Sequence, residues 1–161
     1  MKFNFWKTSS LFRNSFFVFC TLMIANSCNL GHKGKSDQLE NDVDSFAQKY
    51  YNWQFEDALP YCTSDSKKWL QYAASNVHKA DINLLRNKNQ GASYEINDIN
   101  YNNGDTTAII NIKVYNFLQM DTIGNSGRII PSAVFLLKAV FHHEWKIKME
   151  GLPRSEKQNH D

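Results

Sequence analysis

Residues 102–114 read Asn102-Asn103-Gly104-Asp105-Thr106-Thr107-Ala108-Ile109-Ile110-Asn111-Ile112-Lys113-Val114. The Asn-Asn-Gly-Asp part contains residues that tolerate positive φ, as the tight turn of a β-hairpin requires. After this turn, every second residue from Ala108 to Val114 is apolar, whereas Asn111 and Lys113 fall on the other side. A strand with a period of two buries one face and exposes the other. The stretch therefore predicts a hairpin in an antiparallel sheet that has one apolar face.

The segments around this hairpin extend the predicted sheet. Before the turn, the alternation of residues 94–96 changes phase at residues 99–101, which predicts a bulge near Asp98. After a longer turn, the odd positions of residues 129–141 are all apolar and several even positions are apolar too, so we expect both faces of this strand to be partly covered. A turn at His142-His143 then leads to a strand with three inward residues, Trp145, Ile147 and Met149. The total is three or four strands.

The residues before the sheet carry helical patterns. One apolar face recurs at steps of three and four, as in an amphipathic helix, and contains Leu39, Val43, Phe46, Tyr50 and Trp53. A short helix at 55–59 ends at Pro60, and a further helix places inward Trp69, Tyr72, Ala73 and Val77. Residues 78–91 predict a short helix followed by a loop. N-terminal helices packed on a curved antiparallel sheet of three to four strands define an α+β class.

The first 27 residues have the anatomy of an export signal. Three basic residues precede a short apolar run at 16–25, and small or polar residues follow. The run is shorter than the roughly 20 residues that a membrane-spanning helix needs. Because Ile24-Ala25-Asn26-Ser27-Cys28 resembles the cleavage box of bacterial lipoproteins, that resemblance implies removal of residues 1–27 and diacylation of Cys28. The alternative is an ordinary signal peptide, or an uncleaved anchor, in which Cys28 is incidental.

The lipoprotein interpretation divides the chain and assigns it a place. It predicts a signal peptide at 1–27, a flexible tether at 28–36, one domain at 37–152 and a polar tail at 153–161. The protein would be held at the bacterial cell envelope by its lipid. Asn29 differs from the aspartate that resembles an inner-membrane retention signal, which favours the outer membrane over the inner one.

Charge and cysteine content exclude several classes. Residues 1–27 hold three of the 18 basic residues and none of the 16 acidic ones, so the remainder has a net charge of about −1. A concentrated basic face is absent, and no nucleic-acid partner is expected. With Cys20 removed and Cys28 lipidated, Cys62 has no disulfide partner and is expected to be a small buried residue.

No motif assigns a catalytic residue, a cofactor or a metal. His142-His143-Glu144 is expected to be an exposed turn, because neighbouring strand residues face opposite sides and no third ligand is placed by spacing. Phosphate-binding glycine loops, a nucleophilic serine elbow and paired Cys-Xaa-Xaa-Cys motifs are absent from the sequence.

The order of the predicted elements resembles bacterial lipoproteins with an NTF2-like or cystatin-like (DUF4878-type) domain. This order is a long helix, then the segment Trp53-Gln54-Phe55-Glu56-Asp57-Ala58-Leu59-Pro60-Tyr61-Cys62, then long strands that end in Trp145-Lys146-Ile147. The resemblance covers roughly residues 37–150 and implies a curved sheet around the first helix, with a cone-shaped cavity. The residues expected to line this cavity are Tyr50, Trp69, Tyr94, Tyr115 and Trp145.

Two main functions follow as hypotheses. The first is a noncatalytic binding or interaction domain, with a small apolar ligand in the cavity or an envelope protein as its partner. The alternative is a small isomerase or lyase. Tyrosines, Asp57 and Asp98 are of the residue types that such an enzyme uses, but no motif assigns a catalytic role to any of them. The enzyme hypothesis requires a buried carboxyl group with a raised pKa beside a tyrosine.

Overall fold

The structure is a computed structural model that describes residues 27–102, 104, 106–120 and 126–155, with side chains from residue 34 onward. The chain divides into two units, Met1–Asp37 and Gln38–Asp161. In the first unit, the described backbone is the beginning of α2 (Ser27–Tyr50). Residues 28–36 are therefore helical, whereas their composition predicts a flexible tether. Once a helix has formed its first turn, each further residue that adopts the helical conformation adds one backbone hydrogen bond. Extension of α2 into residues 28–36 therefore does not depend on an amphipathic pattern in this segment.

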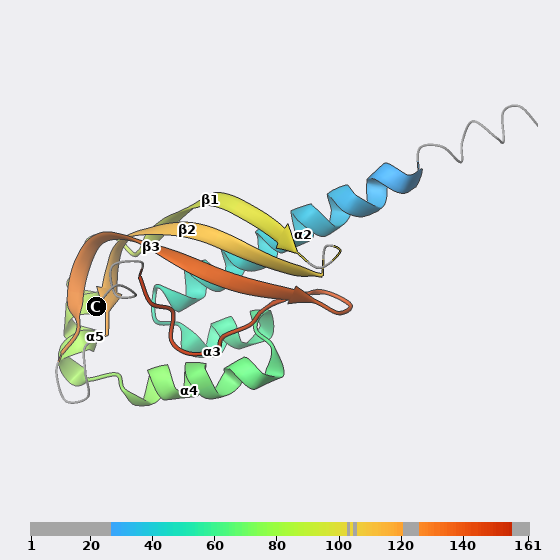
Figure 1. The fold of residues 1–161 in the computed structure, drawn as a ribbon. Coiled ribbons are helices and arrows are strands. Elements are labelled where there is room, and N and C mark those ends of the chain that lie inside the picture. The colour runs from blue at the N-terminus through green and yellow to red at the C-terminus, as the bar shows by residue number, and fades with distance from the viewer. Residues whose placement is uncertain (1–26, 103, 105, 121–125, 156–161) are drawn as a thin grey trace, which may run out of the picture. The chain divides into compact units, whose positions relative to one another are not determined.

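The second unit contains the rest of α2, three further helical segments and a sheet (Figure 1). The helical segments are α3 (Phe55–Ala58) with the 3-10 turn Leu59–Tyr61, α4 (Lys67–Ser75) preceded by the 3-10 turn Ser64–Ser66, and α5 (Lys79–Arg86). The strands are β1 (Ser93–Asn102), β2 (Thr107–Gln119), β3 (Arg128–Phe141) and β4 (Trp145–Ile147). They form one antiparallel sheet in the order β1-β2-β3-β4. The predicted α+β class is confirmed.

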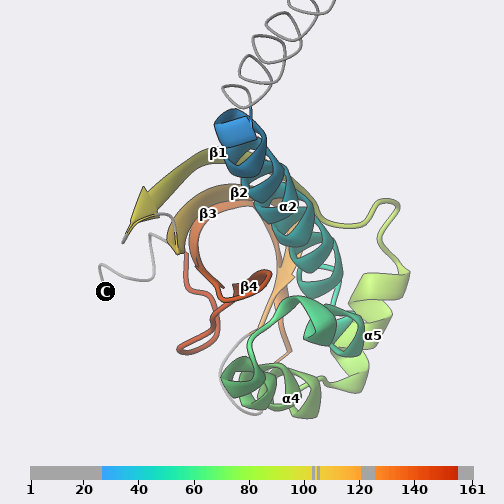
Figure 2. The same cartoon turned by 90° about the vertical axis from the view of Figure 1, so that its right-hand side faces the viewer.

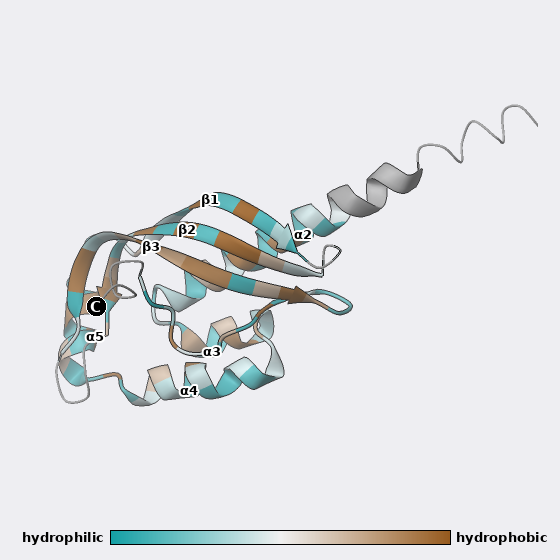
Figure 3. Cartoon of the chain, viewed as in Figure 1, coloured by the Kyte–Doolittle hydropathy of each residue, from teal (hydrophilic) through white to brown (hydrophobic). Residues whose placement is uncertain are grey.

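The core lies between the sheet and the part of α2 from Gln38 onward. The alternate residues of β2 that the sequence assigns to the inner face, Ala108, Ile110, Ile112 and Val114, are all 0% exposed. They belong to one apolar cluster with Leu39, Val43 and Phe46 of α2. Figure 3 shows the corresponding apolar bands along β2 and β3. Burial of each such side chain is worth about 1.5–3 kcal/mol relative to exposure.

Two irregularities accompany the strong curvature of the sheet seen in Figure 2. The β1–β2 register shifts between Ile96 and Asp98, which confirms the predicted bulge. The β2–β3 register is the same at Tyr115↔Ser132 and at Phe117↔Ile130, but Asn116, between the two pairs, is not paired with a residue of β3 and has a φ of 48°. Bulges bend a strand and increase its local twist. The bulge in β1 therefore helps the sheet to curve.

Some predicted faces differ from the structure. The helix α2 ends at Tyr50, so Trp53 is not part of it and instead has a φ of 63°. In α4, Tyr72 is 45% exposed, and Leu70 takes the predicted inward position at 1% exposure. The buried residues of α4, Leu70 and Ala73, are three positions apart and so lie on one side of the helix, and Tyr72 falls outside this side. On the outer face of β3, Val134 and Val140 are partly buried and Leu136 is 53% exposed, so this face is covered for part of its length, as predicted.

The C-terminal segment returns to the sheet. Trp145, Ile147 and Met149 are buried, as predicted, and Ser155 is 7% exposed and forms an isolated antiparallel bridge with Phe135. Residue 155 thus packs on the domain although it belongs to the predicted polar tail. None of the described helices has the length and apolar character needed to cross a membrane.

Candidate functional site

A cavity of about 800 Å³ opens within the second unit between the sheet and the helices. Its lining comes from the end of α2 and the following turn, from α4, from the last residues of β2, from the middle of β3, and from the chain after β4. These segments are far apart in the sequence. The curved sheet and the helices must therefore both be formed before the cavity exists.

Five aromatic rings of the cavity lining contact one another and are here called the aromatic wall: Tyr50, Tyr51, Phe55, Phe117 and Phe135. Tyr51 is at the centre, with its ring centroid 5.1 Å from that of Tyr50, 6.1 Å from that of Phe117 and 5.1 Å from that of Phe135. The rings of Phe117 and Phe135 are 5.3 Å apart and close to perpendicular. Edge-to-face pairs of this kind contribute about 0.5–1.5 kcal/mol beyond the area that they bury.

The turn after α2 holds the aromatic wall in place. Trp53 adopts a left-handed backbone conformation, and its indole Nε1 donates a hydrogen bond to the carbonyl oxygen of Leu118 at 3.0 Å. The indole group therefore connects the end of α2 to the end of β2. This contact fixes Trp53 in the cavity lining, where its ring lies 5.8 Å from that of Phe55.

The hydroxyl of Tyr51 is an exception among the polar groups of the aromatic wall. Tyr51 is 4% exposed, and its hydroxyl is buried without a hydrogen-bond partner among the residues that the structure describes. Burial, and to a lesser extent the neighbouring Tyr50, raises the pKa of Tyr51 well above its usual value, so the hydroxyl stays protonated. An unsatisfied buried polar group costs about 1–3 kcal/mol.

Tyr50 supplies a second phenol to the aromatic wall. It is half-buried, and its ring stacks on that of Phe46 at 5.2 Å. Burial raises its pKa, with a smaller contribution from the Cys62 thiol. Both tyrosines of the wall are therefore neutral at physiological pH and can donate a proton in a hydrogen bond.

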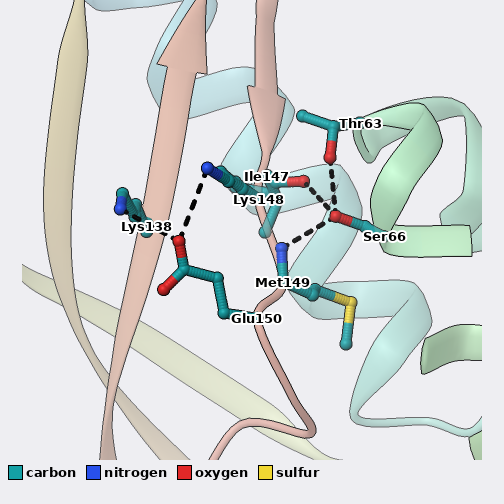
Figure 4. A network of polar contacts seen from close by, with 7 residues as sticks. All are labelled: Thr63, Ser66, Lys138, Ile147, Lys148, Met149 and Glu150. Carbon is teal, nitrogen blue, oxygen red and sulfur yellow. Dashed lines mark hydrogen bonds and ion pairs between the residues drawn. The ribbon is translucent and has the colours of Figure 1, made fainter. Parts of the chain in front are cut away.

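The chain after β4 also lines the cavity, and a buried serine is hydrogen-bonded to it (Figure 4). Ser66 is 0% exposed, and its Oγ lies 2.7 Å from Thr63 Oγ1 and accepts a hydrogen bond from the backbone N–H of Met149 at 2.8 Å. The same oxygen lies 3.4 Å from the carbonyl oxygen of Ile147, to which it donates. This serine therefore joins the helix layer to the end of β4.

Charged residues of the lining include Lys138, Lys148 and Glu150. Both ammonium groups pair with Oε1 of Glu150, at 3.2 Å from Lys138 and 3.5 Å from Lys148 (Figure 4). The hydrogen bond from Lys138 is the main cause that holds the pKa of Glu150 below its usual value. Glu150 is exposed, and it is the one carboxylate among the described lining residues.

This arrangement bears on the enzyme hypothesis, which requires a buried carboxyl group with a raised pKa in the cavity. The described lining does not supply such a group, because the pKa of Glu150 is lowered. Asp57 and Asp98 are exposed and do not belong to the lining. The described lining offers aromatic rings, hydroxyls and an exposed ion-pair cluster.

Of the five residues that the sequence assigns to the cavity, two line it and three do not. Tyr50 and Trp69 belong to the lining. Tyr94 does not, and its hydroxyl donates to the carbonyl oxygen of Asp44 at 2.9 Å. Tyr115 donates to Oε2 of Glu95 at 2.9 Å, and Trp145 is 0% exposed in the core, so neither reaches the cavity.

Sequence reasoning missed three central residues of the aromatic wall, Tyr51, Phe117 and Phe135. Phe135 belongs to the apolar odd positions of the β3 sequence and could have been found by that signal. Tyr51 directly follows Tyr50, the last residue of α2, and its inward position depends on where this helix ends. That end is set by tertiary contacts, which the periodicity does not contain.

The remaining predicted positions have a simpler outcome. Cys62 is buried and free, as expected, and burial raises the pKa of its thiol to about 12. His142, His143 and Glu144 are exposed in the turn before β4, and the described residues contain no group of three metal ligands. Cys28 belongs to the residues of α2 whose side chains lie outside the described part, so its lipidation stays a prediction.

Comparison of the chain with protein-family models, with curated proteins and with solved structures finds no match.

Proposed function

We propose that this domain binds a small, mainly apolar molecule in the cavity bordered by the aromatic wall. The observation that supports the proposal is the combination of an open cavity of about 800 Å³ with a lining rich in aromatic residues. Cavities that hold small molecules usually measure about 300–1,000 Å³ and combine an apolar surface with a few polar groups. Both properties are present here.

The burial of the aromatic residues supports the same conclusion. Trp145 is 0% exposed and serves the core, whereas Tyr50, Trp53 and Trp69 of the lining are only partly buried. Transfer of apolar surface from water is favourable by about 25 cal/mol per Å². A ligand that covers these rings therefore gains binding free energy without displacing a core side chain.

We further propose that the domain acts at the bacterial cell envelope, most simply at the outer membrane. The supporting feature is the N-terminal sequence that ends at Cys28. Two acyl chains on this cysteine would attach the protein durably, because each buried methylene contributes about 0.8 kcal/mol. In this proposal, the lipid anchors the protein at the membrane and the cavity binds the ligand. The alternative to a small-molecule ligand is an envelope protein as the partner.

Two glycines allow a direct test of the cavity. A Cβ atom added at Gly151, which belongs to the lining, would meet nothing within 4 Å, and the same holds at Gly34, which does not. Neither glycine has a positive φ. There is room for a Cβ atom at both positions, so we expect Gly151→Phe to reduce the space in the cavity, and Gly34→Phe is the matched control.

The probe is N-phenylnaphthylamine, an apolar dye that fluoresces when it leaves water. We expect saturable binding to the full-length protein, with energy transfer from the lining residues Trp53 and Trp69. Gly151→Phe should weaken binding by at least about tenfold, which corresponds to about 1.4 kcal/mol, and Gly34→Phe should leave it unchanged. Absence of saturable binding to the wild type, or equal binding to both variants, would contradict the proposal.

A further inference from the structure

The two edges of the sheet differ in how they are covered. At the β4 edge, Cys62 forms a parallel bridge with Ile147, and the N–H of Thr63 donates to the carbonyl oxygen of Ile147 at 3.0 Å. At the other edge, the ten residues of β1 pair with β2 alone within the described part of the chain (Figure 1). Because an unpaired strand edge can pair with another strand, the β1 edge is a candidate binding surface.

The hydrogen-bond pattern shows which backbone groups of β1 point outward. In an antiparallel ladder, successive residues turn their N–H and C=O groups to opposite sides of the strand. The N–H of Phe141 donates to the carbonyl oxygen of Thr106 at 2.8 Å, so the odd residues of β3 and the even residues of β2 face each other. The odd residues of β2 then face β1, and the β1–β2 register leaves Tyr94, Ile96 and Ile99 directed away from β2. Their outward backbone groups bond to none of the residues that the structure describes.

Acidic side chains lie beside this edge. The hydroxyl of Tyr94 donates to the carbonyl oxygen of Asp44 at 2.9 Å, so α2 lies next to β1 at this point. Burial raises the pKa of Tyr94 to about 12, and the Asp44 carboxylate, as a second cause, is therefore near the same hydroxyl. Glu40, one helical turn before Asp44, is exposed, as are Glu95 and Asp98 of β1. Because β1 contains no basic residue, the surface beside the edge is negatively charged.

We propose that the β1 edge binds an extended, basic segment of a partner protein, which adds to the sheet as a fifth strand. In this mode of binding, backbone hydrogen bonds supply affinity and alternate side chains supply specificity. Lys113 of β2 lies opposite Glu95 and offsets one of the negative charges, but the excess stays negative, so lysine or arginine side chains suit the partner.

A second copy of this chain suits the edge less well than a basic segment. Pairing of β1 with β1 would bring Glu95 and Asp98 of both copies to neighbouring strands, and like charges in such positions are destabilising. The inference goes beyond the proposed function, since none of the residues that form the β1 edge lines the cavity.

Hydrogen–deuterium exchange of the full-length protein tests where the segment binds. The probe is a synthetic peptide of alternating lysine and valine, whose valines would extend the inner face beside Ile96 and Ile99. At saturating peptide, the N–H groups of Tyr94, Ile96 and Ile99 should exchange at least about tenfold more slowly. The N–H of Glu95, which faces β2, should not change. Absence of binding, or binding without this protection, would overturn the proposal.

Two controls identify other occupants of the edge. A peptide of alternating glutamate and valine should bind at least about tenfold more weakly than the lysine peptide, and equal affinities would overturn the choice of a basic partner. Protection of the same N–H groups in the protein alone, rising with its concentration, would show that a second copy occupies the edge and would also overturn the proposal.

A pair of matched double variants tests the charge. Glu95→Gln combined with Asp98→Asn should raise the dissociation constant of the lysine peptide by about 2- to 10-fold, the range expected for two exposed ion pairs. Glu56→Gln combined with Asp57→Asn removes the same two charges from the exposed side of α3 and should leave the dissociation constant unchanged. Equal affinities of the two double variants would show that the acidic residues of β1 do not select the partner.

Discussion

Ser66 Oγ accepts a hydrogen bond from the backbone N–H of Met149 at 2.8 Å, and both residues are buried. The two residues are 83 positions apart in the sequence. Ser66 precedes α4, whereas Met149 follows β4 and lines the cavity. This contact therefore helps to hold the helix layer against the chain after β4, which lines the cavity.

Removal of this hydroxyl should destabilise the domain. In Ser66→Ala, the N–H of Met149 loses its acceptor in a buried place, and we expect a loss of about 1–3 kcal/mol in the free energy of unfolding. Chemical denaturation followed by circular dichroism measures this change. Ser75→Ala removes an exposed hydroxyl that donates to the carbonyl oxygen of Tyr72, and it should cost less than about 0.5 kcal/mol. Equal stabilities of the two variants would show that the Ser66 contact does not hold the layers together.

Gly127 should not tolerate a side chain. An added Cβ would lie 2.5 Å from the backbone carbonyl oxygen of Gln119, so the strand ends must move. The N–H of Gly127 also donates to Oδ1 of the buried Asp81 at 2.7 Å, and movement would weaken this bond. We expect Gly127→Ala to lower the free energy of unfolding by about 1–3 kcal/mol.

The matched control for Gly127 is Gly151→Ala, which adds the same methyl group in open space. Its stability should stay within about 0.5 kcal/mol of the wild type. A Gly127→Ala protein as stable as this control would mean that the ends of β2 and β3 do not approach each other as closely as the structure indicates.

Asp42 should make stability depend on pH. Its Oδ2 atom is buried without a partner among the described residues, and burial raises its pKa, with Lys146 lowering it and Glu144 raising it by smaller amounts. The folded protein therefore binds this proton more tightly than the unfolded chain does. Stability from this group is present at low pH and is lost as the pH rises through the unfolded and then the folded pKa.

Asp42→Asn removes this pH-dependent loss. We expect the variant to gain stability relative to the wild type at about pH 7 and to lose that gain toward about pH 3, below the ordinary aspartate pKa of about 3.9. Glu40→Gln, on the exposed side of the same helix, is the matched control for removal of a negative charge. A stability difference between Asp42→Asn and the wild type that does not change with pH would contradict this account.

Cys28 should carry the lipid. When the full-length gene is expressed in a bacterium, the intact mass of the membrane-bound protein should equal that of residues 28–161 plus a diacylglyceryl group, and Cys28→Ala should lack this addition. Cys62→Ala is the control, because Cys62 is buried in the domain and should not affect processing. An unlipidated wild-type protein would rule out the proposed anchor.

The sheet could be predicted from the sequence because each strand carries its pattern of inward and outward residues within a few consecutive positions. The alternation from Ala108 to Val114, the change of phase near Asp98 and the inward Trp145 all agree with the structure. The ends of helices were harder to predict, since Trp53 continues the helical period but leaves the helix in a left-handed conformation. Its hydrogen bond to Leu118, 65 residues away, favours this conformation, and a local pattern contains no such contact.

The candidate site was less predictable than the fold. Tyr50 and Trp69 were expected in the cavity and line it, but an aromatic residue on an inward face can equally belong to the core, as Trp145 does. The inward position of Tyr51 depends on the end of α2, and the role of Ser66 depends on a strand that follows much later. Both are consequences of tertiary packing.

The central claim is that the cavity holds an apolar small molecule, and the affinity of N-phenylnaphthylamine for Gly151→Phe relative to Gly34→Phe tests it most directly. The account predicts that the dissociation constant of Gly151→Phe exceeds that of Gly34→Phe by at least about tenfold, with Gly34→Phe equal to the wild type. Equal dissociation constants for the two variants would contradict the claim, because the dye would then bind elsewhere.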